Sequence, residues 1–297
     1  MKFEFIKAHR DEFYIHLMCQ KLGVSASGYY AWRDRPESNR SQEDAQLLLE
    51  IEKVHQESLE TYGYRRIYKA LLELEISASR RRIARLMRGN GLRGKQFRRY
   101  VVTTKPGKRL PDVPDRIERQ FTVTHPNKAW VADITYVRTG EGWLYLAVVI
   151  DLFSRMVVGW AMGPRLTNDL TLRALRMAYR KRQPPNGLIH HSDRGTQYTS
   201  DEYQQLLAAH KTDASFGKVG CCYDNAAMES FFGTLKSEWL YFHRFETRQQ
   251  AMSSIFYFIE AFYNRKRLHS TIGYQSPVAF EQAAILKEQS DLTSSPL

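Results

Sequence analysis

The sequence predicts an α/β (α+β) protein in which all-helical segments precede a mixed sheet with flanking helices. Three patterns predict this class. Helical periodicity broken by turn residues fills most of the first hundred residues. β-rich runs separated by glycine turns begin near Lys128. Further along the chain, helical and strand patterns alternate, which indicates helices packed on a mixed sheet.

Composition indicates a folded chain with an anionic partner. The 297 residues are 43% hydrophobic, which is enough to bury a core and to divide into a large and a small domain. The net charge is +12, and residues 1–125 hold 25 Lys and Arg against 16 Asp and Glu. This surplus favours a nucleic acid, because Lys and Arg release counterions from phosphates; plain solubility is the alternative.

Cysteine content and hydropathy indicate the compartment. Cys19, Cys221 and Cys222 suggest neither a disulfide framework nor a zinc site. The sequence contains no apolar run of membrane-spanning length and no secretion signal. We therefore expect a cytoplasmic protein without a membrane partner.

Residues 1–40 are expected to form a helix-turn-helix segment. An amphipathic helix around Leu17 breaks at Gly23, and a second helix restarts after Ser25 or Ser27, both good N-caps. Such units place their second helix in the DNA major groove, but short helical hairpins are also common packing units. Both interpretations stay open here.

Residues 41–100 are expected to form a second DNA-binding unit of the same kind. A helix over Ala45–Leu59 is followed by helices over Arg65–Leu74 and Arg80–Arg88, with Ser79 as the N-cap of the last. That last helix combines an apolar stripe with an arginine face. We expect this face to contact DNA, although a solvated basic face is the alternative. The arginines are Arg80, Arg81, Arg82, Arg85 and Arg88.

The proline-containing basic stretch at 101–124 predicts a linker, and the sheet follows it. Strands over Trp130–Thr139, Trp143–Asp151 and Met156–Met162 are expected to form an antiparallel meander. Asp151 and Asp224 are interpreted as turn or cap residues. The later elements are expected at Asp169–Lys181 (helix), 188–192 (strand), Asp201–His210 (helix), 213–216 (strand) and Tyr223–Glu238 (helix).

Three acids in this region suggest a metal site. Asp133 lies within an apolar strand, where an ionised carboxylate is costly unless it is paired. Asp193 follows the next apolar strand, and Glu229 lies within about 20° of Lys236 on one helix edge. Each strand acid alone is explained as a cap or turn residue. Together, three converging carboxylates require a multivalent cation, and oxygen ligands suit Mg²⁺ or Mn²⁺.

The segments "WVADITYV", "HHSDRGTQYTS" and "YDNAAMESFFGTLKSE" resemble the catalytic motifs of the integrase-core transposases of bacterial insertion sequences, in particular the OrfB product of the IS-three family. As in that family, 35 residues separate Asp193 from Glu229, and Lys236 stands seven residues after Glu229. The segments "YGYRRIYKALLE", "SRRRIARLMRGNGLRG" and "YNRKRLHSTIGYQSP" are also similar, so the resemblance covers essentially the whole chain.

The resemblance implies an RNase H-like catalytic core at 125–285, followed by a tail at 286–297. It implies that Asp133, Asp193 and Glu229 are the catalytic residues and hold two Mg²⁺ or Mn²⁺ ions, while Lys236 contacts a DNA phosphate. Water would cut an element end, and the freed 3′-hydroxyl would attack a second phosphodiester. The implied DNA partners are the inverted-repeat ends of the element and the target DNA. The resemblance implies that a homodimer or a larger assembly binds them. It also suggests that the chain acts as a fusion with the product of an upstream reading frame.

Other residues have weaker expected roles. Arg265 and Arg267 are interpreted as a DNA-facing patch, with a solvated segment as the alternative. His191, Gln197 and Asn225 are candidates for supporting the site, although a strand-end histidine pair is as typical of structural packing. Two other functions remain open at this point, an RNase H-like nuclease without strand transfer and a DNA-binding regulator with an inactive core.

Overall fold

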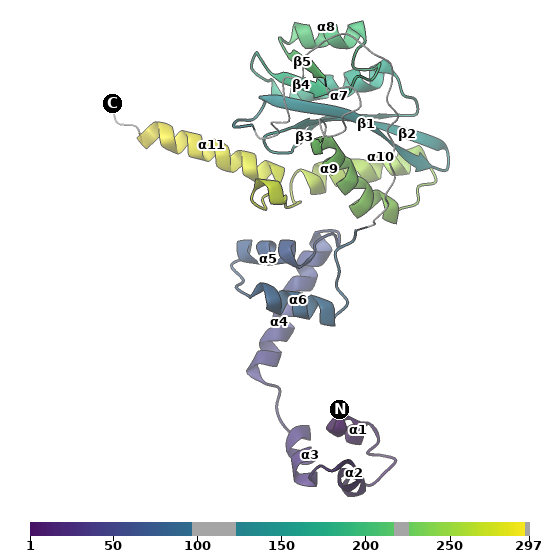
Figure 1. The fold of residues 1–297 in the computed structure, drawn as a ribbon, viewed down its shortest axis with the longest axis vertical. Coiled ribbons are helices and arrows are strands. Elements are labelled where there is room, and N and C mark those ends of the chain that lie inside the picture. Colours follow the sequence, from purple (N-terminus) through teal and green to yellow (C-terminus); the bar gives the residue numbers. More distant parts are fainter. Residues whose placement is uncertain (97–122, 217–225, 295–297) are drawn as a thin grey trace. The chain divides into compact units, whose positions relative to one another are not determined.

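The computed structural model of the protein describes residues 1–96, 123–216 and 226–294. The chain forms two compact units, residues 1–53 and residues 54–297 (Figure 1). Some predictions fall outside the described residues. They concern Cys221, Cys222, Asp224, Asn225 and the predicted linker at 101–124, of which only residues 123 and 124 are described.

The first unit is built from short helices around a small core. Its turn is made as predicted: Gly23 has a left-handed φ of 63° and ends one helix, and the Ser25 hydroxyl accepts a hydrogen bond from the Gly28 N–H to start the next. The core residues are Ile6, Met18, Cys19 and Tyr29. The helices are α1 (Lys2–Ala8), which was not predicted, α2 (Ile15–Leu22), α3 (Ala26–Arg33) and the first part of α4 (Asn39–Glu57).

The second unit begins with the end of α4 and the helices α5 (Tyr64–Glu73) and α6 (Arg80–Gly89). The predicted cap is confirmed, because the Ser79 hydroxyl accepts a hydrogen bond from the Arg82 N–H. α4 starts six residues before the predicted Ala45, since its first turns are exposed and polar and carry no apolar stripe. The predicted apolar stripe of α6 is also confirmed, and its buried residues are Ile83, Leu86 and Met87.

A five-stranded mixed sheet follows, in the order β3-β2-β1-β4-β5. The predicted antiparallel meander is confirmed for the first three strands, and the last two strands join the free edge of β1 in parallel. The predicted fold class is therefore confirmed. The strands are β1 (Ala129–Thr139), β2 (Gly142–Asp151), β3 (Val157–Gly163), β4 (Ile189–Ser192) and β5 (Asp213–Phe216).

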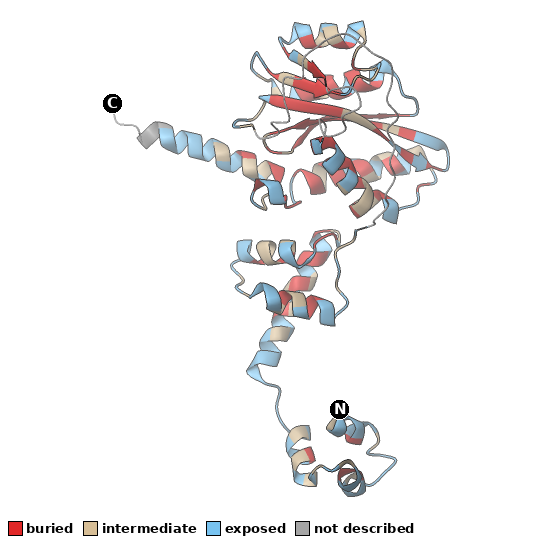
Figure 2. Ribbon diagram, in the orientation of Figure 1, coloured by how far each residue is buried: buried red, intermediate tan, exposed pale blue. Residues whose placement is uncertain are grey.

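Helices cover both faces of the sheet (Figure 1). α7 (Asn168–Arg182) and α8 (Asp201–Ala209) pack on the face that carries Trp130 and Ala132 and close the main core there. α9 (Ala226–Thr234) and α10 (Arg248–Phe256) contact β1 from the other side. Figure 2 shows that buried residues are concentrated in the strands, whereas α8 is mostly exposed or intermediate. Within the described residues, helices thus cover both faces of the sheet.

The C-terminal part continues from α9 as further helical segments, most of which the periodicity did not predict. None of the helices in the described ranges is long and apolar enough to cross a membrane. The segments are the π-helix η2 (Leu235–Trp239), the 3-10 helix η3 (Leu240–Phe242), the π-helix η4 (Tyr257–Tyr263), the 3-10 helix η5 (Ser270–Ile272) and α11 (Pro277–Ser294).

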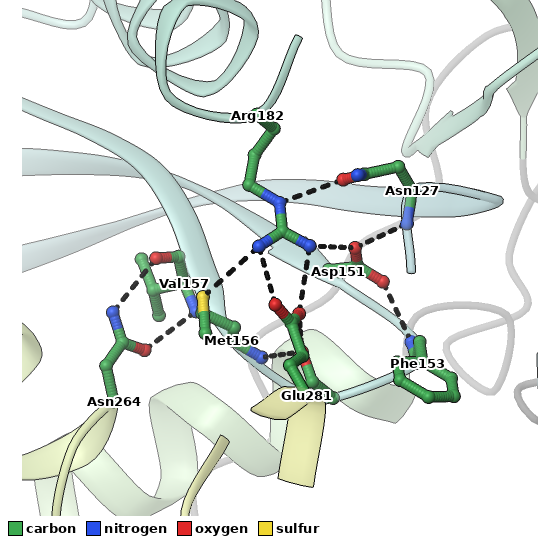
Figure 3. A network of polar contacts seen from close by, with 9 residues as sticks. Asn127, Asp151, Phe153, Met156, Val157, Arg182, Asn264 and Glu281 are labelled. Carbon is green, nitrogen blue, oxygen red and sulfur yellow. Dashed lines mark hydrogen bonds and ion pairs between the residues drawn. The ribbon is translucent and has the colours of Figure 1, made fainter. Parts of the chain in front are cut away.

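A buried ion network joins α11 to the sheet (Figure 3). Arg182, at the end of α7, forms two hydrogen bonds to the Glu281 carboxylate of α11, at 2.6 and 2.9 Å. The same guanidinium contacts Asp151 at 3.3 Å, and the Ser154 hydroxyl donates to Glu281 at 2.6 Å. Both acids are buried, and their pairing with Arg182 offsets the free-energy cost of removing two carboxylates from water.

Candidate active site

Strand pairing brings Asp133 and Asp193 together. β1 and β4 run in parallel, and their last paired residues are Ala132 and Ser192. Asp133 and Asp193 are the next residues along the two strands, which in a sheet lie about 4.8 Å apart. Two acids separated by sixty residues of sequence therefore stand at one point of the sheet, where β4 ends and β1 continues.

The backbone fixes one oxygen of each acid. The Oδ1 atom of Asp133 accepts a hydrogen bond of 2.7 Å from the Ile134 N–H, and Oδ1 of Asp193 accepts one of 3.0 Å from the Gly195 N–H. Gly195 is close to that carboxylate, since a Cβ atom there would lie 2.9 Å from Oδ1 of Asp193. A side chain at position 195 would therefore displace the Asp193 carboxylate.

Glu229 comes from the helix that packs beside β1. The predicted apolar stripe anchors α9, with Met228, Phe231 and Phe232 buried, and Glu229 is on the exposed side. After Thr234 the helix widens into the π-helix η2, which carries the half-buried Lys236. π-helical turns inside helices occur frequently at functional sites.

Electrostatics show that the three acids and the lysine share one region. The pKa of Asp133 is raised to about 7, first by burial and then by the charge of Asp193, with a further contribution from Glu229; the Ile134 N–H and Lys236 act in the opposite direction. Burial lowers the pKa of Lys236, and the Asp133 charge partly offsets this. Asp133 is therefore held among like charges that one lysine does not balance.

The donor set fits a divalent cation. Across residues 1–96, 123–216 and 226–294, no three His, Cys, Asp or Glu side chains are grouped closely enough to hold a metal ion. Asp133, Asp193 and Glu229 nevertheless interact electrostatically, and they offer only carboxylate oxygens. Such oxygens are the ligands that Mg²⁺ and Mn²⁺ prefer, and a cation would relieve the repulsion that Asp133 experiences.

The histidines near the acids have structural partners. Nδ1 of His191 lies 2.9 Å from the Ser215 hydroxyl, and Nε2 of His190 lies 3.0 Å from the Tyr203 hydroxyl. Both rings are buried, and burial lowers the pKa of His190 to about 3. Gln197 is half-buried in the turn after Asp193, where its backbone carbonyl accepts a hydrogen bond of 3.1 Å from the Ser200 hydroxyl.

Tyr198 is a residue near the acids that sequence reasoning missed. Its side chain is 2% exposed, and among the described residues its hydroxyl has no hydrogen-bond partner. Burial raises its pKa well above the usual value, and the charges of Asp133 and Asp193 add to this effect. The sequence did contain a feature that points to Tyr198, because this residue belongs to the segment "HHSDRGTQYTS" that carries Asp193.

The predicted DNA-binding arginines have different surroundings. On α6, Arg81, Arg85 and Arg88 are exposed, Arg82 is half-buried, and the Arg80 guanidinium lies 4.8 Å from the centre of the Tyr68 ring. Nothing in these positions conflicts with a DNA-facing role, which stays a prediction.

The prediction for Arg267 is wrong in this structure, whereas Arg265 is exposed as a DNA-facing residue must be. Arg267 is 4% exposed, and its guanidinium forms two hydrogen bonds to Glu238, at 2.8 and 2.6 Å. Alternating basic residues in "YNRKRLHS" suggested a surface patch, but sequence does not show which of them turns inward.

Glu238 also joins the helical domain to the sheet domain. Arg66 of α5 contacts the Glu238 carboxylate at 3.3 Å. Beside it, the Tyr62 hydroxyl donates to the Lys266 carbonyl at 3.0 Å and accepts from the Leu268 N–H at 2.7 Å. Because Glu238 belongs to η2, these contacts reach the segment that carries Lys236. No pattern in the sequence alone predicted this interface.

A separate hollow lies on the α7 side of the sheet. Its volume is about 630 Å³, and its lining includes Trp160, Met162, Arg176, Met177 and Met252. None of the three acids contributes to it. This apolar hollow is therefore not the place where the acids meet.

Three family models match this chain. Two carry the description "Integrase core domain" and cover residues 123–222 and 229–285, and the third, "HTH-like domain", covers residues 41–100. The protein "Insertion element IS600 uncharacterized 31 kDa protein" of Shigella sonnei is 48% identical over 265 residues, 89% of this chain and 97% of the relative. "Transposase InsF for insertion sequence IS3A" of Escherichia coli strain K12 is 41% identical over 283 residues, 95% and 98% of the two chains.

Solved structures match at lower identity. A chain of the simian T-cell lymphotropic virus intasome in complex with PP2A regulatory subunit B56 gamma is 18% identical, with a TM-score of 0.46 over 71% of this chain and 69% of its own. The HTLV-2 integrase catalytic core domain in complex with magnesium is also 18% identical, with a TM-score of 0.42 over 53% of this chain and 97% of its own.

The mixed sheet with its flanking helices, together with the matches to family models, defines an integrase-core protein with an HTH-like domain, which is a DNA-binding architecture. More particularly, the chain belongs to the family of insertion-sequence transposases that includes the IS3 transposase InsF, since the similarity extends over nearly the whole length of both chains.

Proposed function

We propose that this transposase cuts and joins DNA strands at Asp133, Asp193 and Glu229, in a reaction that depends on divalent metal. The observation that carries the proposal is the β1–β4 register, which puts Asp133 and Asp193 next to each other at the end of β4. The charge of Glu229 acts at the same place. An acid with a raised pKa beside other acids and with few cationic partners, as Asp133 is, is typical of functional sites.

The three carboxylates would hold two Mg²⁺ or Mn²⁺ ions. When bound, such ions supply a polarised phosphodiester and an activated attacking oxygen for in-line displacement. The backbone hydrogen bonds from Ile134 and Gly195 hold one oxygen of each of the two acids in place. No protein side chain serves as a nucleophile in this scheme.

Lys236 is assigned to a DNA phosphate near the reacting end. Its ammonium group is half-buried and feels the charge of Asp133, so it is close to the acids without being closed off from solvent. A lysine so placed provides a point charge for a phosphate oxygen. Water would attack first and release a 3′-hydroxyl, and that hydroxyl would then attack a second phosphodiester.

The partners follow from this chemistry. The substrates would be double-stranded element ends and target DNA, and the arginine face of α6 would bind the duplex. Joining two ends in one reaction calls for at least two copies of the chain, so we infer a homodimer or larger assembly on DNA. Fusion to an upstream-frame product is part of the proposal, as is a cytoplasmic, nucleoid-associated location.

One assay tests the proposal. The protein is incubated with Mg²⁺ or Mn²⁺ and duplexes that end in the inverted repeats of its element. Joined products support transposition, cutting without joining supports a nuclease, and retention of DNA without chemistry supports a regulator. The variant Glu229→Gln should lose cutting and joining while DNA binding stays within about twofold. Glu202→Gln on α8, which changes an exposed acid away from the site, is the matched control and should remain active.

A further inference from the structure

Two aromatic side chains are exposed on the hairpin that carries Asp133. Tyr136 of β1 is 48% exposed and Trp143 of β2 is 46% exposed. Their ring centroids are 5.0 Å apart, with the ring planes at 81° to each other. Exposed aromatic rings in contact with each other offer their faces to a partner that can stack on them.

Among the described strands, Tyr136 lies on the part of β1 that has one free edge, and Trp143 is its diagonal neighbour across the hairpin on β2. β4 pairs with β1 only as far as Ala132, so in the described part of the chain no strand covers this edge from Asp133 onward. Tyr136 is three residues further along, which is about 10 Å in a strand. Because side chains alternate between the two faces of a strand, Asp133 and Tyr136 point to opposite faces of β1, and a polymer would meet both only around this open edge.

Lys236 connects the acids to the aromatic pair. Its Nζ atom lies 5.5 Å from the centre of the Tyr136 ring, and its charge is close enough to Asp133 to interact with it. The edge thus presents an acid site, then a cation, then two aromatic rings. A cation for the phosphates and aromatic rings for the bases are the two components of sites that bind unpaired nucleic-acid strands.

The far end of this hairpin is held rigidly. The Arg248 side chain donates to the Trp143 carbonyl at 3.1 Å, and the Arg248 backbone N–H donates to the Glu141 carboxylate at 2.9 Å. The backbone that carries Trp143 is therefore fixed to the start of α10. A fixed ring loses little entropy when it binds a partner, which favours a role as a stacking platform.

We propose that Tyr136, supported by Trp143, stacks on an unpaired base of the DNA strand that is cut at the three acids. The inference rests on the proposed function, because the acids define where the strand is cut. Consecutive nucleotides are about 3.4 Å apart along a strand, so the 10 Å between Asp133 and Tyr136 corresponds to about three nucleotides. Since a paired base does not offer its face, the end of the duplex has to open there.

The experiment compares Tyr136→Leu with Tyr136→Phe on two DNA ends, one fully paired and one with its last three base pairs mismatched. Loss of one stacked base should reduce cutting of the paired end by about 10-fold or more in Tyr136→Leu, while Tyr136→Phe retains wild-type activity because it retains the ring. The mismatched end should restore part of the lost activity. Tyr257→Leu, which removes an aromatic ring of similar exposure elsewhere in the domain, should cut both ends normally.

A binding measurement separates this inference from the catalytic proposal. A fluorescent 2-aminopurine base, placed about three nucleotides from the cut, should be quenched when wild-type protein binds without divalent metal, and not when Tyr136→Leu binds. Quenching without any later cutting would contradict the proposed function but support the stacking site. Normal cutting with equal fluorescence in wild type and Tyr136→Leu would overturn the stacking site alone. A changed oligomeric state in Tyr136→Leu with unchanged DNA chemistry would also overturn it, because the pair would then be a protein contact.

Discussion

The sheet domain contains two groups of acids with opposite surroundings. In the first, Asp151 is fully buried and accepts hydrogen bonds from the N–H groups of Asn127 and Phe153, at 2.7 and 2.9 Å, and from Arg182. Glu281 is paired with the same guanidinium (Figure 3). Each buried oxygen of this group has a donor close by.

In the second group, Asp133 accepts one backbone hydrogen bond, and its near neighbours Asp193 and Glu229 are acids themselves. Among the described residues, Lys236 is the cation whose charge lowers the pKa of Asp133. The difference shows how a structural acid can be distinguished from a functional one. A structural acid is paired with cations of the protein, whereas a functional acid is left with too few cationic partners until the protein binds one from outside.

The largest effect expected from this comparison is that of Asp133→Asn. Strand cutting should fall by about a thousandfold or more, because the amide removes a charged ligand from the metal site. The free energy of unfolding of the metal-free protein should be unchanged or higher, since a repelled, desolvated charge is removed. Kinetic assays and denaturant unfolding measure the two quantities. Asp133→Asn protein that unfolds more easily than wild type would place Asp133 in the structural group.

The reverse behaviour is expected for Arg182→Met. The substitution leaves Asp151 and Glu281 buried without their cation, and breaking such a pair costs about 3–5 kcal/mol of stability. Denaturant unfolding should show this loss, and any fall in DNA cutting should follow the fraction of unfolded protein. Lys181→Met is the control, because the neighbouring lysine makes only a longer contact of 3.4 Å to Glu260 at the surface. Equal unfolding midpoints for the two variants would contradict the structural assignment.

The pH dependence of stability sharpens the comparison further. The folded-state pKa of Asp133 is about 7, above the value of 3.8 for an ordinary aspartate, so the folded protein holds a proton that the unfolded chain has released. The contribution of this group is therefore fully present at low pH and is lost as the pH rises towards about 7. Metal binding needs the ionised carboxylate, so added Mg²⁺ should raise the melting temperature more at alkaline than at mildly acidic pH.

Thermal melting over a pH series measures this effect. Other acids also titrate, so the informative quantity is the difference between wild type and Asp133→Asn. This difference should change between about pH 4 and pH 7 and level off above it. Parallel curves for the two proteins would mean that the environment of Asp133 is not the one described above.

The sequence predicted the elements whose patterns are local. The turn at Gly23, the cap at Ser79 and the antiparallel meander depend on residues close together in the chain, and the structure confirms them. The three acids were expected to converge, but the sequence did not indicate the parallel pairing of β1 and β4, after which Asp133 and Asp193 follow.

Long-range pairing was not predictable from such patterns. Arg267 was expected at the surface, but its partner Glu238 lies 29 residues away on a π-helix that no periodicity indicates. Glu281 and Arg182 are separated by 99 residues, and each looks like an ordinary surface charge in the sequence. Charged residues become structural or functional through partners, and a single sequence does not contain the list of partners.

The smallest predicted effect concerns the turn that presents Asp193. In Gly195→Ala, the new Cβ atom would lie 2.9 Å from the Asp193 carboxylate and 3.3 Å from the Gln197 amide oxygen, so the carboxylate has to shift. We expect DNA cutting to fall by about tenfold, since small displacements of catalytic groups are costly, with a change in unfolding free energy below about 1 kcal/mol. Gly233→Ala is the control on the helix that carries Glu229, where a Cβ atom meets nothing within 4 Å. That variant should stay active and gain about 0.5–1 kcal/mol from the helix. If both variants cut DNA equally well, the position of the Asp193 carboxylate tolerates more freedom than a metal ligand allows, and Asp193 would move to the group of structural acids.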